Sequence, residues 1–425
     1  MPPSRGYASL SSSAPVQRPM CIFSGIQPTG VPHIGNLLGA LFNWVSIQNS
    51  LQASRASSSS TPPPELYFSI VGLHALTIPQ NPATLAQERK DMLASLLAIG
   101  LDPEQSTIYH QDEVGEHAQL HWLLSCLVSM GRLRRMTTWK GKIATARGTA
   151  TPVEPEQGGP TAGEADEGIA DVDEEHRDLS LGLFSYPVLQ AADILLYKAT
   201  HVPIGQDQVQ HLELARDIAA TFNKRFPSSH TTPKSSKSRR EPPFFPLPQP
   251  LITSTPKILS LRDPTAKMSK SAPDPASRIL LTDDDTAIRA KVKRAVTDTE
   301  RSISFDPEGR PGVSSLLSII AALRSYQAQQ TQSTLDPFAA ASAGVTPKEV
   351  AQQLDSSGGG HALLKETVTS ALIEVLGPIR ERFQQLKERE AQSGYLEQVA
   401  ALGREKASVR AKETLGEVKE RMGLR

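Results

Sequence analysis

The sequence predicts an α/β protein, with a Rossmann-like doubly wound parallel sheet followed by an all-helical domain. Three observations support this prediction. Short apolar segments typical of buried strands alternate with longer amphipathic segments over residues 21–281. A turn bounded by Gly25 and Gly30 follows the first apolar segment, where such folds usually bind nucleotides. From residue 282 onward, only helical periodicity remains.

The first domain, residues 21–281, contains the alternating strands and helices. Proline suits the first turn of a helix and glycine the position after its end, so Pro82 and Gly100 bound one helix. Another begins at about Asn36, because apolar residues recur on one face: Leu37, Leu38, Leu41, Phe42 and Val45. The expected strands are residues 20–24, 67–71 and 107–111, and further helices are expected at 116–130 and from about 187.

Three low-complexity segments interrupt this domain and are expected to be surface insertions: residues 50–64, 143–178 and 227–250. The second is acidic between Glu164 and Asp178. Its carboxylates could bind a metal ion, but its low apolar content favours a solvated loop. The third carries a basic run between Lys234 and Arg240, which could contact RNA, although simple exposure to solvent is favoured.

The second domain, residues 282–425, is expected to be entirely helical. Its expected helices are residues 283–296, 314–327, 347–354, 361–376, 378–390 and 395–422. In residues 401–425, seven Lys and Arg residues accompany four Asp and Glu residues, which leaves a net charge of +3. This segment could contact a phosphate backbone, but a solvated helix face explains most of the charge.

The composition excludes several classes of protein. The chain has 425 residues, enough for two domains with sizeable cores, and a formal net charge of +0, so no overall basicity indicates a polyanionic partner. Cys21 and Cys126 are too few for a zinc cluster or a disulfide framework, and they favour a reducing compartment. No apolar run approaches the length of a membrane span.

The first 20 residues contain Arg5, Arg18 and five serines but no acidic residue. This composition is typical of a mitochondrial targeting segment. A disordered tail is the alternative, because four prolines oppose an amphipathic helix: Pro2, Pro3, Pro15 and Pro19.

Two pentapeptides far apart in the chain carry the chemistry. Pro32–Asn36 places a histidine and an asparagine where a glycine-containing turn meets a helix, a favourable site for an anion. Lys267–Ser271 places two lysines in a loop bounded by prolines, and their ammonium groups suit a mobile lid over a polyphosphate. His33 or Lys270 alone would be an ordinary surface residue. As an ordered pair, the motifs resemble the two signatures of class I aminoacyl-tRNA synthetases.

Other stretches narrow the resemblance to the tryptophanyl-tRNA synthetase family, over residues 21–425 apart from the insertions. These stretches are Phe23–Gly30, His74–Thr77, Arg135–Thr137, Ala191–Tyr197, Gly205–Gln208, Asn223–Arg225, Ala295–Asp298 and Met422–Leu424. Two residues depart from the family's usual pattern. Gln190 stands where many bacterial members carry methionine, and Gln206 replaces a usual glutamate.

The resemblance implies the roles of individual residues. Asp193 would accept the indole N–H of tryptophan, and leaving this carboxylate unpaired would penalise other amino acids. The implied tryptophan-binding residues, whose apolar members could equally be core, are Phe23, His74, Tyr186, Gln190, Asp193, Val202, Ile204 and Gln208. The implied ATP-binding residues are Gln27, Gly35, Asp207, Lys267, Met268 and Ser269. The implied catalytic residues are His33, Asn36, Lys140, Lys267 and Lys270.

The resemblance also implies a reaction and its partners. ATP and L-tryptophan would give tryptophanyl-adenylate and pyrophosphate, with Mg²⁺ held through the ATP phosphates and no metal site on the protein itself. The adenylate would then acylate tRNA(Trp), whose anticodon the helical domain would read. The enzyme would be a homodimer with no membrane association.

Two other functions stay open. A tyrosyl-tRNA synthetase belongs to the same superfamily, but Ala191–Asp193 and Phe23–Gln27 resemble the tryptophan type. A catalytically silent relative that binds RNA need not keep the catalytic set together: His33, Asn36, Lys267 and Lys270. We expect the protein in the mitochondrial matrix, with the cytoplasm as the alternative. This expectation rests on the arginine- and serine-containing start, on the bacterial-like sequence, and on Gln190, which resembles the mitochondrial branch of the family.

Overall fold

The computed structural model describes residues 19–57, 63–136, 180–205, 208–227, 242–252, 258–270, 272–331 and 344–425. The expected targeting segment, up to residue 18, and the expected insertion at 143–178 lie outside the described residues. So do residues 58–62 and 228–241 of the other two insertions.

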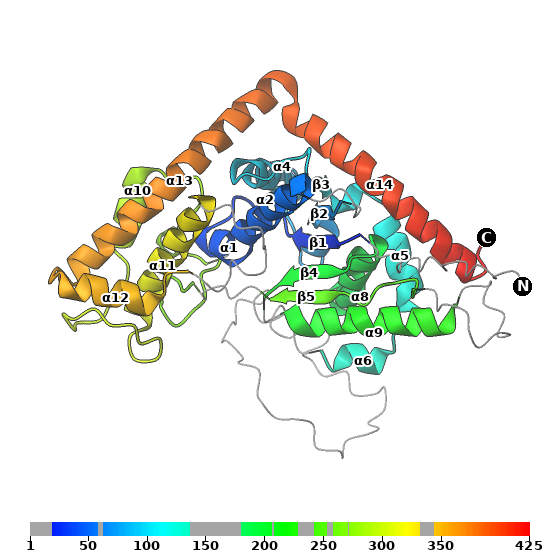
Figure 1. Ribbon diagram of the computed structural model, residues 1–425, viewed down its shortest axis with the longest axis horizontal. Coiled ribbons are helices and arrows are strands. Elements are labelled where there is room, and N and C mark those ends of the chain that lie inside the picture. Colours follow the sequence, from blue (N-terminus) through cyan, green and yellow to red (C-terminus); the bar gives the residue numbers. More distant parts are fainter. Residues whose placement is uncertain are drawn as a thin grey trace, which may run out of the picture.

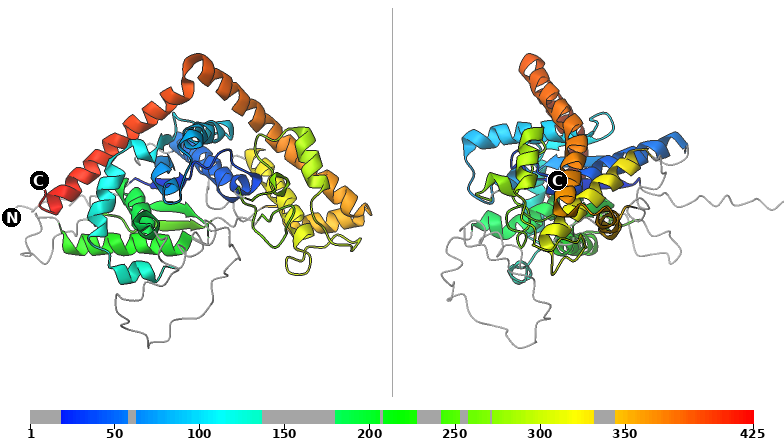
Figure 2. Two further views of the ribbon diagram at one scale, coloured as in Figure 1. Left: turned by 180° about the vertical axis from the view of Figure 1, so that it is seen from behind. Right: turned by 90° about the vertical axis from the view of Figure 1, so that its left-hand side faces the viewer.

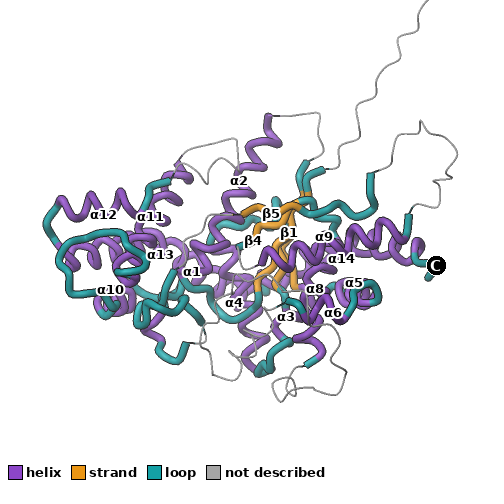
Figure 3. The backbone as a smooth tube through the Cα atoms, turned by 90° about the horizontal axis from the view of Figure 1, so that it is seen from below, coloured by secondary structure: helices purple, strands orange, loops and turns teal. Residues whose placement is uncertain are grey.

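Five parallel strands form one sheet in the order β3-β2-β1-β4-β5, drawn in orange in Figure 3. The strands are β1 Cys21–Ile26, β2 Glu65–Ile70, β3 Thr107–His110, β4 His201–Ile204 and β5 Gln249–Ile252. β1 is the first strand of the chain but lies in the centre, with Ile22 paired to Leu66 on one side and to His201 on the other. The strand order therefore reverses between β1 and β4. This confirms the predicted doubly wound sheet, in which ligands bind at the carboxyl ends of the strands beside the reversal.

Alternation along the strands creates two cores, one on each face of the sheet. Ile22 and Phe68 face a cluster that includes residues of the helices α2, α4, α11 and α13. Phe23 and Tyr67, one position away along the same strands, face a second cluster with α5, α8, α9 and α14.

The helices of the first domain are α1 Ile34–Asn36, the π-helical η1 Leu37–Leu41, α2 Phe42–Ser57, α3 Gly72–Ala75, α4 Pro82–Ala98, η2 Gln111–Glu113, α5 Glu116–Ser125, α6 Met130–Arg134, α8 Leu181–Leu196, α9 Val209–Arg225 and η5 Pro275–Ser277.

The structure confirms the predicted helical C-terminal region. It consists of α10 Asp285–Lys293, α11 Pro311–Thr331, α12 Pro347–Ser356, α13 Gly360–Ser393 and α14 Tyr395–Arg421. Figures 1 and 2 show α13 and α14 as two long helices that meet at an angle, with the sheet beneath them. Gly394 makes the bend possible, because its φ of 62° is a left-handed conformation that favours glycine.

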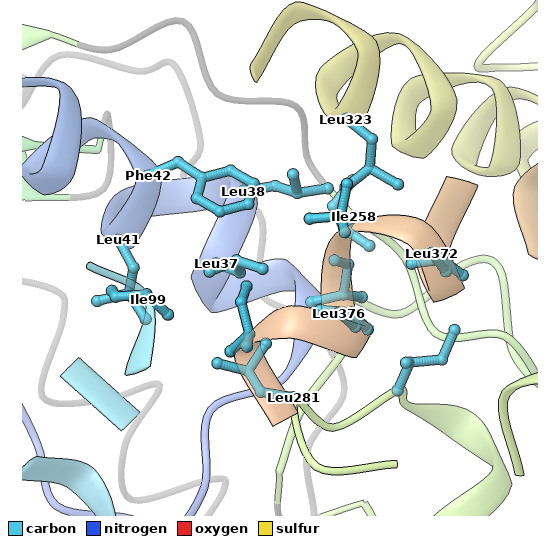
Figure 4. Packing of buried hydrophobic residues seen from close by; sticks show 14 of the residues in the cluster. Leu37, Leu38, Leu41, Phe42, Ile99, Ile258, Leu281, Leu323, Leu372 and Leu376 are labelled. Carbon is cyan, nitrogen blue, oxygen red and sulfur yellow. The ribbon is translucent and has the colours of Figure 1, made fainter. Parts of the chain in front are cut away.

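The helical region and the sheet domain share their cores. Figure 4 shows Leu37 and Leu38 of η1 beside Leu376 of α13 and Ile258 of the loop after β5. On the other side, α14 returns along β3 so closely that a Cβ at Gly403 would lie 1.8 Å from the carbonyl oxygen of Ile108. The sheet domain is therefore packed against α13 on one face and α14 at one edge.

Two helices differ from the sequence predictions. α8 begins at Leu181 and not near Pro187, because Ser180 accepts a hydrogen bond from the N–H of Leu183 and caps the helix. α13 is continuous where two helices, 361–376 and 378–390, were expected. Pro378 lies on its exposed side, while Leu376 and Ile379 on either side of it are buried, so packing outweighs the lost N–H donor.

Other boundaries differ as well. α5 ends at Ser125 rather than 130, and Ser129 caps a separate helix, α6. α2 continues to Ser57, so the first part of the segment 50–64 is helical. β4 and β5 were not predicted at all, because Pro203 and Pro250 argue against strands when only the sequence is considered.

Candidate active site

A cavity of about 380 Å³ lies where the strand order reverses. Residues of β1 and β4 line it, and α8 contributes Tyr186, Gln190, Asp193 and Ile194. Its lining residues are Phe23, Ser24, Gly25, Ile26, Gln27, Asn36, Ala40, Trp44, Val71, His74, Tyr186, Gln190, Asp193, Ile194, Val202, Pro203, Ile204, Gly205 and Gln208. The cavity is thus lined both by apolar and aromatic side chains and by a few polar groups, as small-molecule sites usually are.

His33 caps the first turn of α1 at the edge of this region. Its Nδ1 accepts hydrogen bonds from the backbone N–H groups of Gly35 at 3.0 Å and Asn36 at 3.3 Å. In turn, Oδ1 of Asn36 accepts a hydrogen bond from the backbone N–H of His33 at 3.1 Å. Since Nδ1 is an acceptor, the proton of the neutral ring is on Nε2, which can donate to an anion.

The surroundings of His33 keep its ring neutral. Burial and then the positive charges of Lys270, Lys267 and Arg278 lower the pKa of His33 to about 4. A Cβ at Gly35 would lie 2.9 Å from Cε1 of His33, so the ring itself requires a glycine at this position.

The second motif lies next to the first. Leu281 N–H donates to Pro32 O at 3.0 Å, so the segment that follows the lysine loop is paired with the start of the first motif. Met268 is buried and anchors the loop, and its N–H donates to Ile258 O at 3.0 Å. Lys267 and Ser269 on either side of Met268 are exposed.

Lys270 reaches back toward β1. Its Nζ donates a hydrogen bond to the carbonyl oxygen of Gly30 at 3.0 Å. Burial lowers the pKa of Lys270 to about 8, and the negative charge of Glu88 opposes this shift. The lysine is therefore protonated at neutral pH but close to its titration range.

Among the described residues that line the cavity, Asp193 of α8 is the only acidic one, and it is 1% exposed. Its Oδ2 lies 2.8 Å from Nε2 of His74 and its Oδ1 lies 2.6 Å from Nδ1 of His117. Gln111 Nε2 donates to both oxygens, at 2.7 and 2.8 Å. Burial by itself would raise the pKa of Asp193, but the interactions with His117 and His74 outweigh it and lower the pKa to about 2, so the group is a carboxylate.

The structure brings most of the predicted site residues together. All eight predicted tryptophan-binding residues line the cavity, as do Gln27 and Asn36, and Gln190 donates to Gln208 at 3.5 Å. His33 and Gly35 lie at the start of α1, and Lys267–Lys270 lie in the loop that pairs with Ile258. Lys140 and Asp207 lie outside the described residues.

Sequence reasoning missed four residues around Asp193: Gln111, His117, Tyr109 and Tyr197. Gln111 and His117 are completely buried polar residues that follow the apolar strand β3. A polar residue directly after a buried strand of a parallel sheet is the signal that could have indicated Gln111. Nothing in the local pattern distinguishes His117 from an ordinary helix histidine.

In the described part of the chain, no group of three or more His, Cys, Asp and Glu residues could hold a metal ion. No helix within the described ranges is long and apolar enough to cross a membrane.

Comparison with known proteins gives consistent matches. Residues 15–357 match the family model of class I tRNA synthetases (W and Y). A mitochondrial tryptophan–tRNA ligase of Schizosaccharomyces pombe is 38% identical over 416 residues, covering 95% of this chain and 95% of the relative. Tryptophan–tRNA ligase 2 of Streptomyces avermitilis is 38% identical over 405 residues, covering 95% and 96%. The crystal structure of tryptophanyl-tRNA synthetase from Campylobacter jejuni with ADP and tryptophan aligns with a TM-score of 0.63 and 26% identity, covering 95% of this chain and 100% of that one.

Proposed function

The chain belongs to the tryptophanyl-tRNA synthetase family of class I aminoacyl-tRNA ligases, and we propose that it activates L-tryptophan with ATP and transfers it to tRNA(Trp). One observation carries the proposal. A single cavity is lined by Asn36, from the first motif, and by the buried carboxylate of Asp193. A group that can contact phosphate and a group that can select an indole thus face the same space.

In the first step, a carboxylate oxygen of tryptophan attacks the α-phosphorus of ATP, and pyrophosphate leaves. This reaction needs no protein nucleophile, so positioning and charge stabilisation provide the catalysis. The Nε2–H of neutral His33 donates to a phosphate oxygen, and Asn36 lies one helical turn away at the cavity wall. Lys270 and Lys267 stabilise the negative charge that accumulates on the departing pyrophosphate.

Mg²⁺ would be held by the phosphates of ATP and not by a metal site of the protein itself. The ion commonly binds through substrate phosphates, retains several waters and needs few protein carboxylates. The predicted catalytic residues of the two motifs suit this arrangement, because they are cations and neutral donors: His33, Asn36, Lys267 and Lys270. When bound, Mg²⁺ neutralises part of the phosphate charge.

Asp193 provides the selection for tryptophan. Its carboxylate would accept the indole N–H, a donor that phenylalanine lacks and that tyrosine carries at another position. A site built around a buried acceptor discriminates strongly, because the wrong amino acid leaves that acceptor unpaired. Tyr186 and Phe23 contribute flat apolar walls to the same cavity.

The second step uses the adenylate to acylate a terminal ribose hydroxyl of tRNA(Trp), the 2′-hydroxyl in class I enzymes. We assign reading of the anticodon to the helical region after residue 281. The long helix α13 extends this region away from the sheet (Figure 1), which suits contact with a distant part of an extended RNA.

We also propose a homodimer. Three large apolar side chains, called here the apolar patch, are exposed on neighbouring helices: Trp122 of α5 (70%), Met130 of α6 (58%) and Leu181 of α8 (76%). α5 and α6 both pack against α8, so the three side chains lie on neighbouring helices. Exposed apolar groups of this size typically mark protein interfaces, and a second copy of the chain is the occupant that the family resemblance implies.

The proposed compartment is the mitochondrial matrix. The Schizosaccharomyces pombe relative is mitochondrial, although the Streptomyces avermitilis relative is equally identical. The first 20 residues add a composition typical of a targeting segment. Fluorescent fusions of the full chain and of a chain without residues 1–20 test this proposal. Mitochondrial fluorescence that is lost on truncation supports it, and cytoplasmic fluorescence of the full chain contradicts it.

The first experiment on activity is ATP–pyrophosphate exchange with tryptophan, tyrosine and phenylalanine. Exchange that depends on tryptophan alone supports the proposed function. Exchange with tyrosine indicates a tyrosyl-tRNA synthetase. Absence of exchange in a folded protein that still binds tRNA indicates the silent RNA-binding relative.

A further inference from the structure

The carboxylate of Asp193 is held from two sides. Gln111 and His117 contact it from the protein interior, and neither belongs to the cavity lining. His74 contacts Oδ2 from the cavity wall. His117 contacts only Oδ1, whereas Oδ2 is shared by Gln111 and by His74 of the cavity wall. Oδ2 is therefore the oxygen that faces the cavity.

Gln111 has only one possible orientation. Its Oε1 accepts a hydrogen bond from the backbone N–H of Leu73 at 3.0 Å. The amide nitrogen must then point toward Asp193, where Nε2 lies 2.7 Å from Oδ1 and 2.8 Å from Oδ2. Because Leu73 precedes His74 in α3, the same short helix fixes both the interior and the cavity-side partner of the carboxylate.

His117 is fixed in a similar way. Its Nε2 lies 3.1 Å from the hydroxyl of Tyr109 and 3.0 Å from the hydroxyl of Tyr197. Burial raises the pKa of both tyrosines, so the hydroxyl groups keep their protons and one of them can donate to Nε2. The ring proton is then on Nδ1 and is directed at Oδ1 of Asp193, 2.6 Å away.

We propose that Gln111 and His117 are positioning residues that hold the Asp193 carboxylate with Oδ2 toward the indole N–H of tryptophan. This inference rests on the proposed function. Neither residue lines the cavity, so each acts on selectivity through the position of Asp193 and not by contact with tryptophan. Without them the carboxylate can turn about its Cβ–Cγ bond, and the hydrogen bond that distinguishes tryptophan becomes weaker.

The alternative is that these buried hydrogen bonds only stabilise the core. A stability role would lower the activity with every amino acid substrate equally. A positioning role would lower the activity only with substrates that carry the N–H. The two roles are separated by comparing L-tryptophan with β-(3-benzothienyl)alanine, in which sulfur replaces the indole N–H.

The experiment measures kcat/KM for both substrates in ATP–pyrophosphate exchange, using the full chain. In His117→Leu and in Gln111→Leu, the preference for tryptophan should fall by about 10- to 100-fold, with the sulfur analogue little affected. His117→Asn should restore the preference, because its amide can donate from a position close to that of Nδ1. His110→Leu is the control, since His110 is a buried histidine of β3 whose Nδ1 has no hydrogen-bond partner among the described residues.

The sulfur analogue also reports folding, because its exchange persists only if the variant is intact. An unchanged preference in both leucine variants, or an equal loss with both substrates, overturns the inference. If the wild-type protein does not exchange pyrophosphate with tryptophan, the proposed function itself fails. These two failures are distinguished by the wild-type measurement alone.

Discussion

Lys270 and Gly30, 240 positions apart in the chain, are joined by a 3.0 Å hydrogen bond from Nζ to the carbonyl oxygen. The bond holds the lysine loop against the turn that follows β1, beside the neutral ring of His33. In the proposed mechanism, this ammonium group would meet the polyphosphate of ATP. A backbone carbonyl group therefore holds the Lys270 side chain in position. The phosphate groups of ATP would compete with this carbonyl oxygen for the Nζ donor.

Replacement of Lys270 tests its role in activation. Lys270→Ala should lower the rate of tryptophan-dependent ATP–pyrophosphate exchange by about 10²- to 10³-fold, because a charge that stabilises the departing pyrophosphate is lost. Binding of tRNA, measured by filter retention, should change little. Lys348→Ala, at an exposed lysine of α12, is the matched control. Unchanged exchange in Lys270→Ala would remove this residue from the mechanism.

The pKa of Lys270 predicts a pH dependence. Because its pKa is lowered to about 8, the free enzyme loses this positive charge as the pH rises through that value. The kcat/KM for ATP should therefore decrease above about pH 8 in the wild-type protein. Lys270→Arg should lack this decrease, because a guanidinium stays charged throughout the range. The same alkaline decrease in both proteins would assign the titration to another group.

The lowered pKa of His33 predicts a pH dependence of stability. Its value of about 4 lies below the ordinary 6.5, so the unfolded state binds more protons between these pH values. The free energy of unfolding should decrease by about 3 kcal/mol from this group as the pH falls from about 6.5 to 4. His33→Asn keeps an acceptor at the helix cap but cannot titrate. Urea unfolding at several pH values should show a larger loss in the wild-type protein, and equal losses would contradict the assignment.

The apolar patch predicts the oligomeric state. Trp122→Glu should convert the dimer to a monomer, because a charge would be buried without a partner at the interface. Sedimentation velocity measures the change. Val409→Glu, at a side chain of α14 that is 58% exposed, should leave the dimer intact. A wild-type protein that sediments as a monomer would disprove the proposed homodimer.

The contact between α14 and β3 predicts a difference between two glycines of one helix. Gly403→Ala should lower the free energy of unfolding by about 2–3 kcal/mol, because the added Cβ would overlap the carbonyl of Ile108. Gly416→Ala should raise it by about 0.5–1 kcal/mol through helix propensity, since the nearest atom, 3.2 Å away, is the end of the flexible Arg425 side chain. Urea unfolding measures both, and similar effects at the two sites would show that α14 does not pack closely on β3.

The sequence predicted the elements whose local pattern is strong. β1, β2, β3 and α4 follow from apolar runs, from proline at a helix start and from glycine after a helix end. It did not predict β4 and β5, which are short, contain proline and become strands only because β1 already offers a hydrogen-bonding edge. It also divided α13 at Pro378, because burial of the residues on either side of a proline is a property of the packed molecule.

The sequence by itself determined the fold class, the two motifs and the residue types that a phosphate site and an indole site need, since these depend on short segments and their order. Only the tertiary structure decided which of these groups are joined to each other by hydrogen bonds. Gln111 and Asp193 are 82 positions apart, and Lys270 and Gly30 are 240 apart, so no local pattern links either pair. Their hydrogen bonds exist because the parallel sheet brings the ends of distant strands together and the burial of each polar group requires a partner.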